Sequence, residues 1–365
     1  MRKIDIDYVD IGSILSKPIY GTDSMMLLNK GAILTLTYIE RLKKTGVSSV
    51  YIDDGFIDDV SDDQILSEET RRKAVQNIKS VFHNIKHDSI EDISPVKIIV
   101  TRIIDELSAS SGVLLCPSDI SLYDEYVYNH SVNVAAISII IGMSLKYDKK
   151  KLYDLGVAGM LHDIGKTKIP TEILNKPAKL SNEEYELVKK HAFYGYELLL
   201  GNPKIDTGTP LIALQHHERY DGTGYPKGLK NKAISEFAQI MAIADVYDAM
   251  GSDKYYRKSI PSHEIYRFLL ENSGKLFNPA LIDKFLENMA LYPKGTMVML
   301  SDGQAGFVVS QNYSDPKRPV LRLFWDRDGT EISNIVEVNL LEETQLEIFQ
   351  VIEGKMKGIK QTQAT

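Results

Sequence analysis

Residues 216–226 have the sequence HHERYDGTGYP, and the interpretation of the whole chain starts from this stretch. Its two histidines stand at the end of an apolar helical pattern in which Pro210 suits the first turn. Residues 221–228 contain three glycines and a proline, so the backbone there can approach a ligand closely. Imidazole is the side chain that most often binds metals. The stretch therefore offers two candidate metal ligands beside a loop that is either an ordinary surface loop or one that binds a ligand.

Five of the eight histidines form an ordered series with two aspartates along a region of helical periodicity. His162 and Asp163 follow a helix predicted over 152–161, and Asp245 lies in an almost wholly apolar helix predicted over 239–250. A carboxylate buried there needs a cation or strong hydrogen-bond donors. Imidazoles and carboxylates in these numbers can hold two divalent metals, with Asp163 as a bridging ligand. The full series is His130, His162, Asp163, His191, His216, His217 and Asp245.

Each member of the series also has a structural interpretation. A single histidine on a helix is more often a core or surface residue than a ligand, and an adjacent His-Asp pair often arises by chance. Asp245 alone could cap a helix or pair with an arginine. We expect His83, His87 and His263, which lie outside the series, to be structural residues of this kind. The metal hypothesis therefore depends on the combined order of the residues.

The same residues carry a resemblance to a known family. Residues 162–166, HDIGK, resemble the signature of the HD phosphohydrolase superfamily, and residues 216–226 resemble the extended motif that defines the HD-GYP family. The similarity is close over about 130–258 and extends loosely to 291. It implies an all-α domain whose metal centre hydrolyses the bacterial signalling nucleotide cyclic di-GMP to linear pGpG, to GMP or to both.

The resemblance also implies roles for individual residues. One metal would be held by His130, His162, Asp163 and Asp245, and the second by Asp163, His191 and one or both of His216 and His217. Two divalent ions, iron or alternatively manganese, would activate a hydroxide that attacks the phosphodiester at a binuclear centre. Asp163 and Lys166 would be catalytic, with the Lys166 ammonium stabilising charge on the phosphate. The implied substrate-binding residues are Lys166, Gly222, Gly224, Tyr225, Pro226, Asp248, Lys254 and Arg257.

Two positions depart from the pattern of the family. Lys254 stands where an arginine is common, which would replace a bidentate phosphate contact by a single point charge. Some members carry a glutamate four residues before the first histidine and build a three-metal centre. This chain has Tyr126 there, with Glu125 one step away from the ligand face, so we expect two metals.

The periodicity of the chain predicts a multi-domain, mainly α protein. We expect a small α+β domain over 1–65, a helical connecting segment over 66–114 and the all-α HD-type domain over 115–291. Period-two patterns such as 297–300 and 320–325 predict a small antiparallel β unit over 292–345, and 346–365 reads as a polar tail.

Composition limits the other functions. The formal net charge of −7 gives no basic footprint for a nucleic acid polymer. Cys116 is the single cysteine, which fits a reducing compartment. The N-terminus turns acidic before an apolar segment forms, and the longest apolar stretch, 134–143, is too short to span a bilayer. These observations predict a cytoplasmic protein without a membrane span.

Other functions stay open on the sequence alone. The chain could be a cyclic di-GMP-binding sensor with little turnover, or a phosphodiesterase for another cyclic dinucleotide such as cyclic GMP-AMP. A related metal fold supports oxygenases. The glycine-rich loop at residues 221–228, which we call the GYP loop, argues against an oxygenase. The hypothesis for the N-terminal region is regulation or dimerisation, which would give a homodimer. A signalling-protein partner would contact either that region or the GYP loop.

Overall fold

The computed structural model describes residues 2–20, 26–53, 55, 57, 65–86, 89–90, 92–109, 115–116, 126–176, 178–252 and 259–352. This part of the chain folds into two compact units. One draws on segments 1–63 and 290–365, and the other on segments 64–252 and 259–289. Every predicted metal ligand lies in the second, helical unit.

The N-terminal segment folds into a small sheet and one amphipathic helix. Strands β1 (Arg2–Asp5), β5 (Ser49–Asp53) and β2 (Ile14–Leu15) pair antiparallel in that order, and β3 (Ile19–Tyr20) pairs with β4 (Met26–Leu28). The short helix η1 (Ile6–Tyr8) follows β1, and α1 (Leu36–Lys44) begins where the Thr35 side chain accepts a hydrogen bond from the Tyr38 amide. This segment therefore contains both a helix and short strands.

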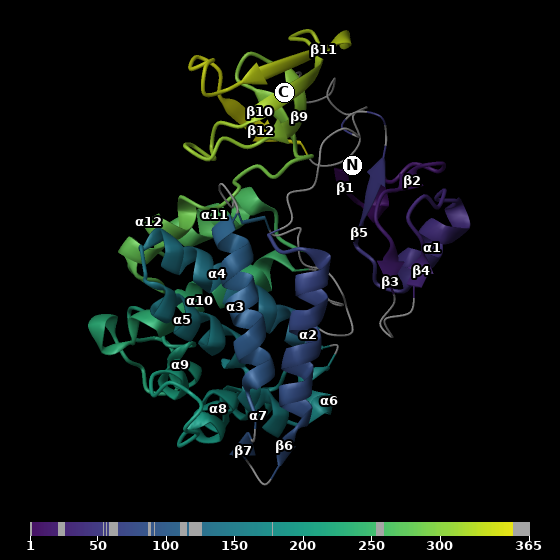
Figure 1. Cartoon of the computed structure of the whole chain (residues 1–365). Helices are drawn as coiled ribbons and strands as arrows, with labels where there is room; N and C mark the ends of the chain where they lie inside the picture. The colour runs from purple at the N-terminus through teal and green to yellow at the C-terminus, as the bar shows by residue number, and fades with distance from the viewer. Residues whose placement is uncertain are drawn as a thin grey trace. The chain divides into compact units, whose positions relative to one another are not determined.

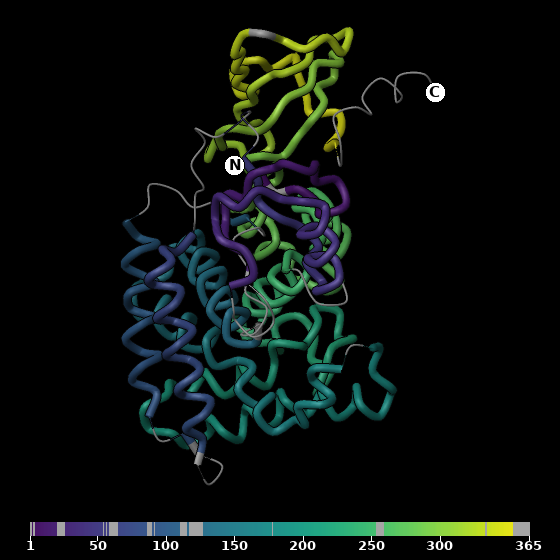
Figure 2. Tube along the Cα trace, turned by 90° about the vertical axis from the view of Figure 1, so that its right-hand side faces the viewer, coloured from purple at the N-terminus to yellow at the C-terminus, as the bar shows by residue number. Residues whose placement is uncertain are grey.

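The described part of the helical segment predicted over 66–114 contains two helices and a hairpin. Helix α2 (Glu68–His83) and helix α3 (Ser94–Ala109) run side by side (Figure 2), and β6 (Ile85–Lys86) and β7 (Ser89–Ile90) connect them. The apolar faces of both helices belong to the same core as the helices that follow. These helices are therefore grouped with the helical unit, and the predicted boundary at residue 114 stays a prediction.

The helical unit is built around α4 (Tyr126–Ser144), which packs against α5 (Lys149–Leu161) and α10 (Glu236–Gly251) (Figure 1). The window Val127–Ser144 is long and apolar enough to cross a membrane by length and composition, but 78% of it is buried inside the unit. Because a core helix passes the same test, we assign α4 to the core. The other elements are η3 (Ile164–Lys168), α6 (Thr171–Leu174), α7 (Asn182–Lys189), α8 (His191–Leu199), α9 (Thr209–Gln215), η4 (Asn231–Ala233), α11 (Ser262–Glu271) and α12 (Pro279–Leu286).

The C-terminal segment is a five-stranded antiparallel sheet. Its strands are β8 (Met297–Leu300), β9 (Ala305–Ser310), β10 (Val320–Trp325), β11 (Glu331–Asn339) and β12 (Ile348–Val351), in the order β11-β10-β9-β8-β12. Alternate residues such as Val298 and Leu300 fill its core. The predicted β unit is present, but its pairing continues through β12, past the boundary predicted at residue 345.

Candidate metal centre

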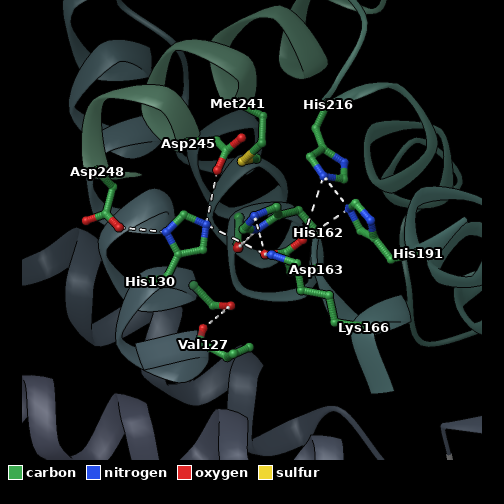
Figure 3. Close-up of polar contacts among 12 residues, drawn as sticks. Val127, His130, His162, Asp163, Lys166, His191, His216, Met241, Asp245 and Asp248 are labelled. Carbon is green, nitrogen blue, oxygen red and sulfur yellow. Dashed lines mark hydrogen bonds and ion pairs between the residues drawn. The ribbon is translucent and has the colours of Figure 1, made fainter. Parts of the chain in front are cut away.

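The series of histidines and aspartates converges on one place because most of its members stand at helix ends. His162 directly follows α5, Asp163 precedes η3, and His191 is the first residue of α8. His216 directly follows α9. His217 follows His216, and the last two members, His130 and Asp245, come from the core helices α4 and α10 (Figure 3).

Four of these side chains form one group of possible ligands. The ligand atoms of Asp163, His191, His216 and His217 all lie within 4.8 Å of one another. The Nε2 atom of His191 is 3.3 Å from that of His216 and 3.1 Å from that of His217. Asp163 Oδ1 faces the same group, 3.4 Å from His191 Nε2 and 3.8 Å from His216 Nε2.

A second group lies on the other side of the same carboxylate. The ligand atoms of His130, His162 and Asp245 are also within 4.8 Å of one another. His130 Nε2 is 3.1 Å from Asp245 Oδ1 and 3.6 Å from Asp163 Oδ2, and His162 Nε2 is 3.4 Å from that same Asp163 oxygen. The two oxygens of Asp163 therefore face different groups, which is the arrangement that a bridging ligand requires.

The hydrogen bonds of the imidazole rings indicate which nitrogens are available to a metal. Three histidines direct Nδ1 at the backbone carbonyl three residues earlier: His162 at Gly159, His191 at Val188 and His216 at Ala213, over 2.7, 2.6 and 2.7 Å. A carbonyl only accepts, so Nδ1 carries the proton and Nε2 presents a lone pair. Within the described residues, His162 Nε2 and Asp163 Oδ1 are buried without a hydrogen-bond partner. Converging lone pairs of this kind fit divalent cations, and the mixed imidazole and carboxylate set suits a transition metal.

His130 is held differently from the three histidines whose Nδ1 faces a backbone carbonyl. Its Nδ1 lies 2.6 Å from Asp248 Oδ2, and the Asp248 side chain is 0% exposed (Figure 3). A carboxylate that accepts from the far nitrogen of a metal-binding histidine fixes the ring and makes it a stronger ligand. Asp248, which the resemblance implied as a substrate contact, is thus buried behind His130. We propose that it positions this ligand.

Burial and neighbouring charges set the protonation of the cluster in the metal-free protein. Burial and the nearby His162 and His191 lower the pKa of His216 to about 3. Burial opposes protonation of His130, yet Asp245 and Asp248 raise its pKa to about 9. Burial alone would raise the pKa of Asp163, but the Lys166 ammonium and His162 hold it well below its usual value. The Asp163 carboxylate is therefore ionised, as a ligand must be.

The residues implied to contact substrate have different surroundings. The Lys166 ammonium pairs with Asp163 Oδ2, and its side chain keeps 24% exposure. The Tyr225 ring packs on the His217 ring, with centroids 4.7 Å apart at 30°, and Pro226 is exposed beside it. Lys254, Arg257, Glu125 and the side chain of Tyr126 lie outside the described residues, so the expectations for them are unchanged.

The two glycines implied at the substrate are required by the loop itself. A Cβ atom on Gly224 would lie 2.5 Å from the His217 carbonyl oxygen and 2.3 Å from the Arg219 amide nitrogen. Gly222 has a φ of +85°, which favours glycine, and a Cβ there would meet the Lys230 side chain. The glycines therefore let the loop close tightly against the backbone of His217.

Glu218 is a functional candidate that sequence reasoning missed. Its carboxylate accepts hydrogen bonds from the amides of Lys227 at 2.8 Å and Leu229 at 2.9 Å, and the side chain is 2% exposed. The bonds tie the far end of the loop to the residue next to His217. An acidic residue inside the motif, followed by a loop that returns after nine residues, was the available signal.

Comparison with known proteins identifies the unit that holds this centre. Residues 116–281 match a family model described as an HD domain, and residues 297–357 match one described as a KOW domain associated with HD domain. The chain contains an HD domain. The predicted resemblance of this HD domain to the HD-GYP family is confirmed.

The HD domain is similar to named proteins of several bacteria. A cyclic di-GMP phosphodiesterase of Pseudomonas aeruginosa is 38% identical over 227 residues, which cover 61% of this chain and 55% of that protein. A 3'3'-cGAMP-specific phosphodiesterase of Vibrio cholerae is 39% identical over 132 residues, 36% of this chain and 25% of that protein. The chain spans about half the length, or less, of the curated relatives it matches.

A solved structure supports the fold. An HDG"Y"P protein from Bdellovibrio bacteriovorus aligns with a TM-score of 0.51 and 20% identity, covering 78% of this chain and 97% of that one. At this identity the likeness concerns the fold alone.

Proposed function

We propose that this chain is a metal-dependent phosphodiesterase that hydrolyses cyclic di-GMP. The observation that carries the proposal is the convergence of imidazole nitrogens and carboxylate oxygens, most of them on buried side chains, into two groups that each face one oxygen of Asp163. Two-metal sites of this type are suited to displacement at phosphorus. The choice of substrate is supported by the relative from Pseudomonas aeruginosa that is named a cyclic di-GMP phosphodiesterase.

The proposed centre takes two divalent ions, iron or manganese. When bound, the ions would supply a nucleophile at neutral pH by lowering the pKa of water, and would stabilise charge on the attacked and leaving oxygens. Asp163 gives one carboxylate oxygen to each group of ligands. The Lys166 side chain is 24% exposed and holds its ammonium beside Asp163, where it can donate to a phosphate oxygen. The hydrolysis would yield pGpG, GMP or both.

The test uses purified full-length protein under reducing conditions. Its iron and manganese content is measured, cyclic di-GMP is added with either metal, and the products are separated by chromatography. The variant that combines His162→Ala and Asp163→Ala is expected to lose bound metal and to form no product. His83→Ala is the matched control, because His83 is exposed on α2 outside the cluster.

The outcomes separate the proposal from its alternatives. Product from the wild type and the control, but not from the double variant, supports the proposed activity. Cyclic di-GMP that binds without cleavage to the metal-loaded wild type contradicts it and favours a sensor. Preferential cleavage of cyclic GMP-AMP would assign the substrate of the Vibrio cholerae relative instead.

The proposal also covers the binding partners of the chain and its location in the cell. We propose a homodimer or a signalling-protein contact through the N-terminal segment or the GYP loop, and activity in the cytoplasm. A mass measurement by light scattering and fractionation of cells that produce the protein would test these points.

A further inference from the structure

Two tyrosine rings and one lysine lie together beside the candidate metal centre. Lys189 ends α7, and its Nζ lies 5.4 Å from the centroid of the Tyr185 ring and 5.6 Å from that of the Tyr225 ring. We call Tyr185, Lys189 and Tyr225 the aromatic rim. Because the inner side of Tyr225 packs on the proposed ligand His217, the rim lies next to the cluster.

The rim is accessible to a ligand. Tyr185 is 50% exposed and the Lys189 side chain 25% exposed. Both ammonium–ring distances are near the upper limit of about 6 Å for a cation–π contact, so the flexible lysine stem can move aside with little loss. Lys189 also pairs with the Glu186 carboxylate at 2.5 Å, and the Glu186 side chain is 65% exposed. Exposed ion pairs contribute little to stability, so this contact does not hold Lys189 in place.

A simple packing role explains only part of this arrangement. Tyr185 and Lys189 are four residues apart on one helix, a spacing at which side chains meet in any case. Tyr225 comes from a separate segment, the GYP loop, and completes the rim only because the loop is folded back on His217. Two rings and a cation from different elements at the edge of a proposed phosphodiesterase centre form a surface that suits a nucleobase.

We propose that the aromatic rim is a guanine subsite in which Lys189 selects guanine over adenine. This inference rests on the proposed function, because it assigns the base of the substrate whose phosphate meets the metal centre. Aromatic rings stack on any base, so Tyr185 and Tyr225 give affinity without selection. Guanine presents two acceptors, O6 and N7, to an ammonium, whereas adenine places a donor amino group where O6 would be. Lys189 therefore distinguishes the two bases.

The first measurement is the affinity of the metal-loaded protein for GMP and for AMP, by calorimetry. These mononucleotides contain no phosphodiester to cleave. The wild type is expected to bind GMP more tightly. Lys189→Met should weaken GMP binding about tenfold, the scale of a specific contact to a base edge, and leave AMP binding nearly unchanged. Lys190→Met is the matched control, because it removes the same charge from an exposed neighbour.

The second measurement separates stacking from selection. Tyr185→Leu should weaken GMP and AMP equally, by about tenfold, as expected for stacking. The ratio of kcat/KM for cyclic di-GMP to that for cyclic di-AMP should fall about tenfold in Lys189→Met and be unchanged in Tyr185→Leu. Metal content and circular dichroism of each variant report whether the site and the fold are intact.

The results have distinct meanings. Equal weakening of GMP and AMP in Lys189→Met would overturn the inference, since the lysine would then act on a phosphate. No preference for GMP in the wild type would overturn it as well. If the protein cleaves no cyclic dinucleotide while Lys189 still controls the preference for GMP, the proposed function fails and the guanine subsite stands.

Discussion

Replacing Asp248 by asparagine should weaken one half of the metal centre. Asp248 is fully buried, and its Oδ2 accepts from His130 Nδ1 at 2.6 Å. The amide of asparagine keeps an acceptor of similar shape but loses the negative charge that holds the imidazole and makes it a stronger ligand. Substitution of such outer partners lowers metal affinity or activity about 10–100-fold, which corresponds to about 1.4–2.7 kcal/mol.

The loss should fall on one metal and not on both. His130 belongs to the group with His162 and Asp245, whereas the other group is held by Asp163 and three further histidines. The protein is dialysed against a graded series of chelator concentrations and then analysed for metal. Asp248→Asn should lose one ion at a chelator concentration about 10–100-fold lower than the wild type does. Asp283→Asn, on the exposed face of α12, is the matched control.

The experiment also distinguishes two roles for Asp248. A residue that contacts substrate would change KM and leave the chelator series unaltered. If Asp248→Asn retains both ions as the wild type does and only KM rises, the positioning role argued from the 2.6 Å contact is refuted. Loss of both ions together would show that the two groups do not bind separately.

Three further predictions follow from single contacts. Glu218→Gln replaces one of the two acceptor oxygens by a donor that faces a backbone amide. Because a hydrogen bond to a charged group contributes about 1.5–3 kcal/mol, the loop should be held less firmly, and KM should rise while metal content is retained. An unchanged KM would contradict the assigned role. Gly165→Ala places a Cβ 2.0 Å from the His191 carbonyl oxygen, and urea denaturation should show a loss of about 1–3 kcal/mol; wild-type stability would contradict this packing. The pKa of His216 is lowered to about 3 in the folded metal-free protein, from an ordinary 6.5, so the unfolded chain binds the extra proton and stability should fall as pH falls from 6.5 toward 3. Denaturation of chelator-treated protein at pH 7 and pH 5 tests this, and equal stability would contradict it.

The convergence of the predicted ligands could be anticipated from the sequence because their signals are local. The His-Asp pair after a helical pattern, and the two histidines before a glycine-rich loop, are visible within a dozen residues, and these side chains do converge. Strands β8 and β10 were equally legible, since each is a short run of four to six mostly apolar residues. In each case a short stretch of sequence is enough to predict the element or the candidate ligand.

Contacts between distant segments could not be predicted in this way. Asp248 meets His130 across 118 positions, because α4 packs on α10 with one particular rotation of each helix. Helical periodicity alone does not fix that rotation when both helices are apolar nearly all round. The hairpin between α2 and α3 was missed for a related reason: its strands have two residues each, too few for a period to appear.

The helix ends explain why a metal centre can form from residues so far apart. The last carbonyls of a helix lack intrahelical partners, and Gly159, Val188 and Ala213 each lie within the last four residues of their helix. In each case the histidine three residues later directs Nδ1 at that carbonyl. The bond that satisfies the end of the helix therefore also fixes the ring and directs the Nε2 lone pair toward the centre. Because three rings are held this way before any ion arrives, binding need not order them, and the metal site is a product of the same contacts that end α5, α7 and α9.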